Sequence, residues 1–277
     1  MMTFKRLLLL TLSAATLSGC TAAVVAPVLA PLVAFPPSLQ GDDSPKITDA
    51  VSPVPGEAVF YNITYEEHGA RFSAQDSAAG VNKARLVSVY GAEDDYAATW
   101  QSIGAPETFL TVQDLDLTYP DGSIGKRRIV RLKATAQSPG VEGANPSFTG
   151  IKQAWPRANY TTRVIYSPQQ DGDRAGILAW QDNQHYVFCG AAQLNGKPAA
   201  VLARRESGDE PDEGLMQATY PLDAKSLTDL GLLIEIQDGR LSCFFSTPKL
   251  GRTLVGTVNV QADQRVLIGA HAFSPAP

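Results

Sequence analysis

From residue 59 onward, the chain is a series of short runs rich in β-branched and aromatic residues, separated by Gly, Pro, Asp and Asn. The runs span 59–65, 128–132, 160–166, 175–180, 185–192, 199–204, 232–236, 240–246, 254–260 and 266–273. Asp238-Gly239, between two apolar runs, is a strong signal for a tight hairpin, because both residues tolerate a positive φ. Only 222–230 hints at a helix, and a short turn would account for it. Long amphipathic helices are missing, so the pattern predicts an all-β fold, an antiparallel sandwich or jelly roll.

The first twenty residues have the composition of an export signal. Lys5 and Arg6 supply positive charge, and an apolar run begins at Leu7. This run is shorter than the roughly 18 residues that a membrane-spanning helix requires, so it predicts a signal segment. Its end, Leu17-Ser18-Gly19-Cys20, resembles the lipobox of bacterial lipoproteins, in which the cysteine is acylated and becomes the new N-terminus. The resemblance implies a lipid on Cys20; the alternative is an ordinary cleaved signal peptide with an incidental cysteine.

The residue after the cysteine bears on localisation. In lipoproteins of two-membrane bacteria, an Asp there usually marks retention at the inner membrane, whereas this chain has Thr21. The resemblance therefore implies an envelope protein anchored in the lipid bilayer of the outer membrane, on its periplasmic or surface face. Prolines recur through residues 21–56 and favour extended chain over regular helix. We expect a signal peptide at 1–20, a tether at 21–56 and a β-sandwich domain at 57–277.

The composition limits the possible partners and the size of the core. The formal net charge of −5 argues against nucleic acid, because binding to phosphates requires a basic face. An apolar fraction of 44% allows a proper core, and the roughly 220 residues after the tether suffice for one large domain or two small ones. The three histidines lack the spacing of metal ligands. The sequence requires no cofactor and does not specify an oligomeric state.

Three cysteines are present, and two of them remain once Cys20 is assigned to the lipid. Exported proteins can form disulfides, so Cys189 and Cys243 could be bridged. The alternative is a pair of buried free thiols, because cysteine packs in a core like a small apolar residue. The sequence leaves both possibilities open.

The C-terminal half contains recognisable segments. They are 147–153 (Ser-Phe-Thr-Gly-Ile-Lys-Gln) with 160–164, 173–182 with Tyr186, 232–246, and 268–272. In this order they resemble the C-terminal domain of family-43 glycoside hydrolases of the β-xylosidase type, most strongly over 147–277. The resemblance implies a concanavalin A-like jelly roll of two antiparallel sheets. Trp100 and 128–132 are similar to its opening strands, while 57–95 resembles nothing known and could add strands or form a small lobe.

The resemblance does not extend to catalysis. In the family, a five-bladed propeller that precedes this domain performs hydrolysis, and the chain has no room for one between the tether and Phe148. Jelly-roll glycosidases carry a Glu-x-Asp-x-x-Glu strand, and that pattern is missing here, as are Gly-x-Ser-x-Gly and His-Glu-x-x-His. We therefore expect no catalytic residues. A glycoside hydrolase that degrades xylan or another glycan is the alternative.

A carbohydrate-binding site is the favoured reading of the polar and aromatic residues. Aromatic faces stack on sugar rings, and amide and carboxylate groups read hydroxyls. The candidates are Trp155, Tyr160, Trp180, Gln181, Asp182, His185 and Tyr186. The alternative is that these side chains pack in the core or at sheet edges. Asp171 and Asp173 could contribute oxygens to a Ca²⁺ ion, although turn chemistry explains both.

Together these observations predict a lipid-anchored envelope protein whose non-catalytic, concanavalin A-like domain binds a glycan. The first alternative is the glycoside hydrolase. The second is a structural envelope lipoprotein that uses the sandwich to bind protein partners.

Overall fold

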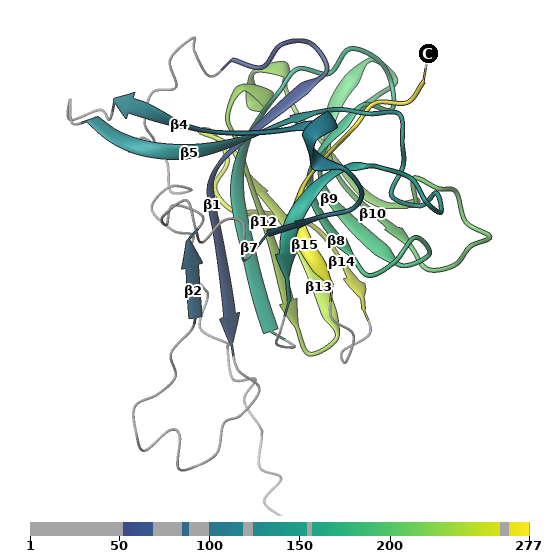
Figure 1. Cartoon of the computed structure of the whole chain (residues 1–277). Helices are drawn as coiled ribbons and strands as arrows, with labels where there is room; N and C mark the ends of the chain where they lie inside the picture. Colours follow the sequence, from purple (N-terminus) through teal and green to yellow (C-terminus); the bar gives the residue numbers. More distant parts are fainter. Residues whose placement is uncertain are drawn as a thin grey trace, which may run out of the picture. The chain divides into compact units, whose positions relative to one another are not determined.

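The computed structural model describes residues 52–68, 85–88, 100–118, 124–153, 157–260 and 266–276 (Figure 1). Cys20, the predicted signal segment and nearly all of the tether lie outside these residues, as does Trp155. In the described part of the chain, no helix has the length and apolar character needed to cross a membrane.

The described strands form two antiparallel sheets. The eight-stranded sheet has the order β14 (Thr253–Asn259), β13 (Arg240–Ser246), β12 (Leu230–Gln237), β7 (Arg157–Tyr166), β1 (Glu57–His68), β5 (Ile124–Lys133) and β4 (Leu110–Thr118), and β2 (Arg85–Ser88) pairs with β1. The seven-stranded sheet has the order β11 (Leu215–Pro221), β10 (Lys197–Arg205), β9 (Tyr186–Leu194), β8 (Arg174–Trp180), β15 (Leu267–Phe273), β6 (Ser147–Lys152) and β3 (Trp100–Ser102). This confirms the predicted all-β sandwich.

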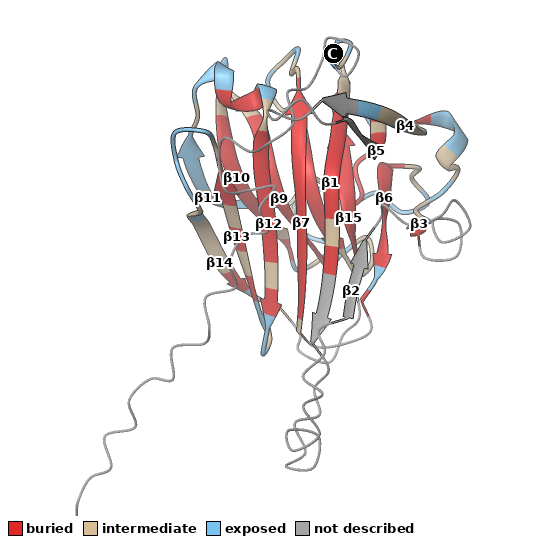
Figure 2. Cartoon of the chain, turned by 90° about the vertical axis from the view of Figure 1, so that its left-hand side faces the viewer, coloured by how far each residue is buried: buried red, intermediate tan, exposed pale blue. Residues whose placement is uncertain are grey.

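The main core lies between the two sheets. On β8, Ala175, Ile177 and Ala179 point into it, while Leu178 and Trp180 face outward, because successive side chains of a strand alternate. The outward side of β8 is buried as well, by a second apolar cluster that includes Phe188. Figure 2 shows the result as long buried stretches on the central strands.

The segment 57–95 contributes strands to this sandwich in its described part. β1 lies between β7 and β5, and Phe60 pairs with Val164 on one side and Val130 on the other. Val59, Phe60 and Tyr61 are fully buried. β1 is therefore a central strand of the eight-stranded sheet.

The turns have the predicted chemistry. Asn195-Gly196 and Asp238-Gly239 adopt positive φ angles at both residues, 50° and 72° in the first pair and 50° and 75° in the second. The predicted helical hint is a single 3-10 turn, Ala224–Thr228, whose N-cap Asp223 accepts a hydrogen bond from the amide of Ser226. Another 3-10 turn, Pro106–Thr108, precedes β4.

Candidate functional site

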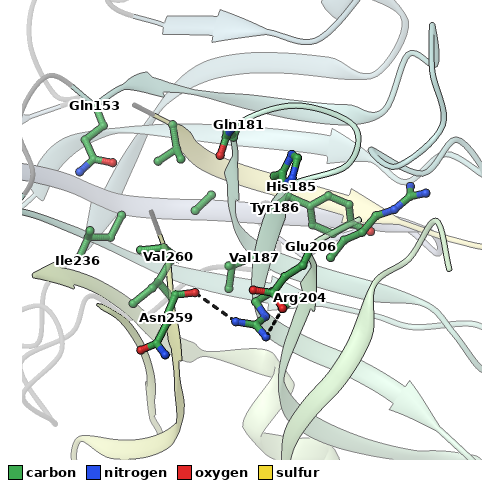
Figure 3. Close-up of a pocket in the computed structure, with 14 residues that line it drawn as sticks. Gln153, Gln181, His185, Tyr186, Val187, Arg204, Glu206, Ile236, Asn259 and Val260 are labelled. Carbon is green, nitrogen blue, oxygen red and sulfur yellow. Dashed lines mark hydrogen bonds and ion pairs between the residues drawn. The ribbon is translucent and has the colours of Figure 1, made fainter. Parts of the chain in front are cut away.

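A cavity of about 260 Å³ opens between the two sheets at the end of the sandwich near the β12–β13 hairpin (Figure 3). Ile236 and Leu241 flank that hairpin and line the cavity from the eight-stranded sheet, together with Asn259 at the end of β14. The seven-stranded sheet contributes residues from the adjoining ends of β8, β9 and β10. The cavity is thus the place where the core between the sheets meets solvent.

Aliphatic side chains form much of the cavity wall. They are Ala179, Val187, Ile236, Leu241, Val260 and Val266. All six belong to the main core or pack against it, so the strand alternation that builds the core also builds this surface. Such a surface suits the C–H face of a small ligand.

Polar side chains complete the lining. They are Gln153, Gln181, His185, Arg204, Glu206 and Asn259, with Tyr186 and Arg205 beside them. Arg204 points inward like Leu202, two residues earlier on β10. Its Nη1 donates to the carbonyl oxygen of Asn259 at 3.2 Å, and its Nη2 to the Glu206 carboxylate at 2.5 Å. The guanidinium is held at the cavity by one carbonyl and one half-exposed carboxylate.

The β8–β9 turn places His185 at the cavity. The Asp182 carboxylate accepts the backbone amides of Gln184 and His185, each at 2.8 Å, and lies 2.8 Å from His185 Nδ1. Burial alone would raise the pKa of Asp182, but the hydrogen bonds from His185 and Gln184 outweigh it and hold that pKa below its ordinary value of 3.8. Asp182 is therefore a charged group that orients His185.

The predicted sugar-contacting residues divide into two groups. Gln181, His185 and Tyr186 line the cavity, and Asp182 supports His185. Trp180 points to the opposite side of β8, where it packs against the outer apolar cluster.

Tyr160 requires a correction. It is 0% exposed and packs in the core with ring centroids 6.5 Å from those of Tyr65 and Trp100. A ring enclosed in this way cannot contact a sugar. Tyr160 therefore packs in the core, which was the alternative to sugar binding.

The two candidate calcium ligands have turn roles. Asp173 is buried, and its carboxylate accepts the amide of Gln169 and the hydroxyl of Ser274, each at 2.6 Å. Asp171 accepts the amide of Gly196 at 2.6 Å. Among the described residues, no group of three or more His, Cys, Asp or Glu side chains could hold a metal ion. The hydrogen bonds of the turns account for both aspartates.

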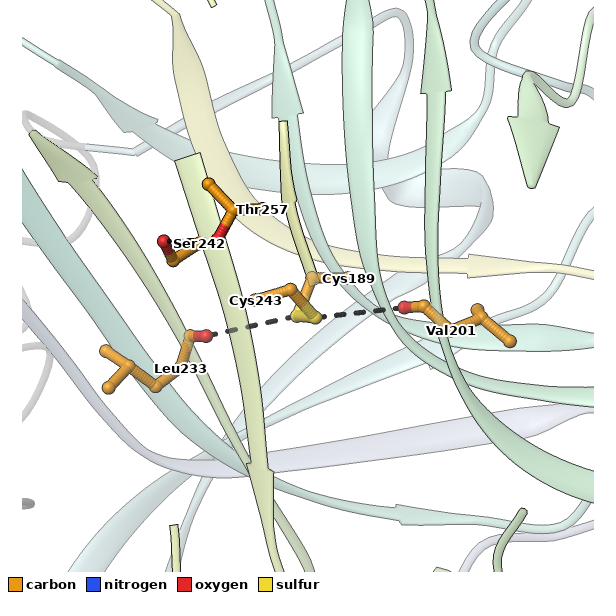
Figure 4. The surroundings of a disulfide bond; sticks show 6 residues. All are labelled: Cys189, Val201, Leu233, Ser242, Cys243 and Thr257. Carbon is orange, nitrogen blue, oxygen red and sulfur yellow. Dashed lines mark hydrogen bonds between the residues drawn. A yellow bond between two sulfur atoms is a disulfide. The ribbon is translucent and has the colours of Figure 1, made fainter. Parts of the chain in front are cut away.

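A disulfide joins Cys189 on β9 to Cys243 on β13, and so connects the two sheets through the core (Figure 4). Both cysteines are fully buried, with their Cα atoms 5.6 Å apart. Of the two possibilities that the sequence left open, the structure has the bridge. Its 54-residue separation corresponds to about 4 kcal/mol of stabilisation in the loop-entropy model.

Sequence reasoning missed four of the six polar residues named above as completing the lining. They come from the ends of three strands, with Gln153 directly after β6, Arg204 and Glu206 at the end of β10, and Asn259 at the end of β14. Gln153 belongs to a motif of the family resemblance, yet the motif alone does not assign it to a site. Glu206 begins an acidic loop, 206–213, and nothing in the sequence of such a loop indicates that a cavity lies beside it.

Comparison with known proteins identifies a family with this fold. The model of one family, the β-xylosidase C-terminal concanavalin A-like domain, matches residues 92–272. The match begins well upstream of residue 147 and includes β3, β4 and β5, whereas β1 and β2 precede it. A search of curated proteins found no match.

Solved structures include similar chains. A GH43_12 protein retrieved from capybara gut metagenome has a TM-score of 0.53 at 13% identity, over 70% of this chain and 35% of that chain. The Bacteroides ovatus xyloglucan PUL GH43B has a TM-score of 0.49 at 21% identity, over 63% of this chain and 33% of that one. A xylan β-1,4-xylosidase from Bacillus halodurans C-125 has a TM-score of 0.45 at 16% identity, over 52% and 29%.

The likeness to the GH43_12 protein concerns the fold alone. This chain spans about a third of the length of each of the three structures. The family match, in contrast, covers more than half of this chain and bears out the predicted concanavalin A-like sandwich. The chain belongs to the family of the β-xylosidase C-terminal concanavalin A-like domain.

Proposed function

We propose that this protein is a lipid-anchored, non-catalytic carbohydrate-binding protein of the bacterial cell envelope. The observation that carries the proposal is the cavity at the end of the sandwich, in which six polar side chains surround an aliphatic surface. A sugar has the complementary character, because its hydroxyls both donate and accept hydrogen bonds while its C–H groups form apolar patches.

The chemistry of the lining supports a neutral sugar. Gln181 and Asn259 carry amides that donate and accept, and Arg204 supplies guanidinium donors. The Arg204 charge is balanced by Glu206, whose carboxylate is 2.5 Å away. Ligand pockets for drug-sized molecules have volumes of about 300–1,000 Å³, so a cavity of about 260 Å³ suits a ligand of about one sugar ring. We infer that it holds the end of a glycan chain, derived from xylan or from the cell envelope.

The anchor is the second part of the proposal. The lipobox resemblance assigns the lipid to Cys20, and Thr21 favours the outer membrane. A domain that forms about a third of longer chains in similar structures would here be attached to a bilayer. The protein would then retain a glycan at the envelope without cleaving it.

Calorimetric titration of the full chain in mild detergent tests the sugar site, with D-xylose, L-arabinose and xylo-oligosaccharides as ligands. Gln181→Ala removes an amide at the cavity and should weaken binding by up to about tenfold, the effect of one lost hydrogen bond. Gln217→Ala, an exposed glutamine on β11, is the matched control. No heat with any sugar would overturn carbohydrate binding, and release of reducing sugar would establish the hydrolase alternative.

Labelling with a palmitate analogue tests the anchor. The wild-type chain should take up the label and sediment with membranes, and Cys20→Ser should lose both properties. Label that persists on Cys20→Ser, or an unlabelled wild-type chain, would contradict lipidation at this residue.

A further inference from the structure

The disulfide lies at the inner end of the cavity. On β9, Val187 lines the cavity and Cys189 follows it by two residues. On β13, Leu241 lines the cavity and Cys243 follows it by two residues. Residues two apart on a strand share a face and lie about 7 Å apart, so the bridge crosses the core one row deeper than the cavity wall.

The two sheets approach each other closely at the bridge. Face-to-face sheets pack about 10 Å apart, whereas the Cα atoms of Cys189 and Cys243 are 5.6 Å apart. Each sulfur also reaches the backbone of the opposite sheet (Figure 4). Cys243 Sγ lies 3.8 Å from the carbonyl oxygen of Val201 on β10, and Cys189 Sγ lies 3.9 Å from that of Leu233 on β12. The core is therefore narrow at this row.

A glycine continues the narrow region on the neighbouring strands. Gly256 on β14 pairs with Cys243. In the other sheet, Leu202 pairs with Cys189 on one side and with Ala218 on the other. A Cβ atom at Gly256 would lie 3.0 Å from Ala218 Cβ and 3.0 Å from Leu202 Cδ2. Carbon atoms in contact are about 3.5–4.0 Å apart, so a side chain at position 256 would push the two sheets apart. We call these five residues the narrow row.

The cavity begins at the next row towards the β12–β13 hairpin. That row holds Ala179, Val187 and Arg204 in one sheet and Ile236, Leu241 and Val258 in the other. All of them except Val258 line the cavity. Polar groups also come from both sheets, with Gln181 directly after β8 and Asn259 at the end of β14. The binding of a ligand that contacts both walls therefore depends on the distance between the sheets.

We propose that the narrow row positions the two walls of the cavity, so that the disulfide and Gly256 set the affinity for the glycan. The proposal rests on the proposed carbohydrate-binding function and adds residues that control it without touching the sugar. Hydrogen bonds require donor–acceptor distances of about 2.7–3.2 Å, so a sugar held from both sheets loses bonds when the sheets move apart. A bridge that only stabilised the fold would leave the affinity of the folded protein unchanged.

Gly256→Ala tests the proposal with the disulfide intact. The measurement is calorimetric titration of the full chain in mild detergent, with whichever of D-xylose, L-arabinose and xylo-oligosaccharides the wild type binds best. The new Cβ atom widens the narrow row, and we expect binding to weaken about tenfold, the effect of one lost hydrogen bond. Adding Ala218→Gly to this variant removes the facing Cβ atom and should restore the affinity to within about threefold of the wild type.

Gly251→Ala is the matched control. Position 251 is exposed, and no atom of the described residues lies within 4 Å of a Cβ atom there. The same chemical change should therefore leave the sugar affinity as it is in the wild type.

Removing the bridge is the second test. Cys189→Ala combined with Cys243→Ala lowers the stability, so thermal melting first establishes a temperature at which this variant is folded. At that temperature its sugar affinity should fall about tenfold or more. If the variant does not fold at any temperature, the Gly256→Ala and Ala218→Gly pair decides.

Unchanged affinity in Gly256→Ala, or in the folded double cysteine variant, would overturn the proposal. A loss in Gly256→Ala that Ala218→Gly does not restore would also overturn it, because the contact between the sheets would not be its cause. In each of these cases the wild type still binds sugar and the proposed function stands. A wild type that binds no sugar would overturn the proposed function, and the role of the narrow row with it.

Discussion

Two consecutive arginines at the end of β10 lie in opposite surroundings. Arg205 faces outward from the seven-stranded sheet, where its guanidinium contacts Asp212 at 2.9 Å and the carbonyl of Gly140 at 2.6 Å, with its side chain only 5% exposed. Arg204 faces the cavity beside Glu206, and its side chain is 21% exposed. Arg205 thus closes one region by packing, whereas Arg204 lines the open cavity.

The surroundings of Arg205 form a sealed face, which we define by Ser138, Tyr186, Arg205, Asp212 and His271. Ser138 and Tyr186 both donate to the carbonyl of Asp212, and the void beside them is about 10 Å³, room for about one water molecule. The cavity on the other side of β10 is about 260 Å³. Strand alternation directs Arg204 to the cavity and Arg205 to the sealed face, and Tyr186 and Arg205 of the sealed face also border the cavity.

The largest expected effect concerns the two arginines. Arg205→Ala removes a buried guanidinium that bonds the carbonyls of Gly140, Ser207 and Gly208 as well as the half-exposed Asp212 carboxylate, and should cost about 3 kcal/mol of unfolding free energy. Arg204→Ala should cost less than about 1 kcal/mol, because its partner Glu206 is half exposed to solvent, but should abolish sugar binding. Urea unfolding and calorimetry measure the two effects. Equal losses of stability would remove the distinction between the regions.

The next effect is the pH dependence of the sealed face. Burial lowers the pKa of His271 to about 3, against an ordinary value of 6.5. Between these values the unfolded chain binds a proton that the folded chain excludes, so stability falls as the pH drops below about 6.5. The loss from this group should approach about 2 kcal/mol at pH 5.

His271→Asn should flatten this part of the pH profile, since Asn keeps a donor for the carbonyl of Ser147, which lies 2.9 Å from His271 Nδ1. Urea unfolding between pH 5 and 8 provides the measurement. A variant whose profile falls as steeply as that of the wild type would show that other groups carry the dependence.

Tyr186→Phe should have a smaller effect that does not depend on pH. The change removes the hydroxyl that donates to Asp212 but keeps the ring, at a cost of about 1 kcal/mol. Burial raises the pKa of Tyr186 to about 12, so the phenol does not titrate between pH 5 and 8. A loss that varies with pH in this range would couple Tyr186 to a titrating neighbour.

The smallest change in stability is expected at the cavity rim. Asp182→Asn should alter the unfolding free energy by less than about 0.5 kcal/mol, because the amide oxygen still accepts from the turn. Sugar affinity should nevertheless drop several-fold, since the charge that orients His185 is lost. Unchanged affinity would separate His185 from the site.

The sequence predicted the sandwich and most of its strands, but it did not predict β11. Six of its seven residues are exposed, so Leu215–Pro221 has no apolar alternation to recognise. β4 was missed for a related reason, because its alternating Asp114 and Asp116 resemble a solvated segment as much as an edge strand.

The site was only half predictable because β8 and β9 are buried on both sides. When no polar residue breaks the pattern, the sequence does not show whether Ala179 or Trp180 faces inward. Trp180 was predicted as a sugar contact because its side chain is aromatic. The sequence did identify the turn Gln181–Tyr186, because its polar and aromatic residues are neighbours along the chain. Arg204 and Asn259 meet only through the order of the strands, which sequence periodicity does not specify.

The disulfide between the sheets has a consequence for the timing of folding. In a reducing compartment the thiols of Cys189 and Cys243 would stay apart, and the chain would lack the roughly 4 kcal/mol that the bridge contributes. Typical domains are stable by only about 5–15 kcal/mol, so the reduced chain would open far more readily. A protein with such a disulfide across its core passes most easily through a translocation pore before its cysteines are oxidised. It is hardest to unfold once the disulfide has formed.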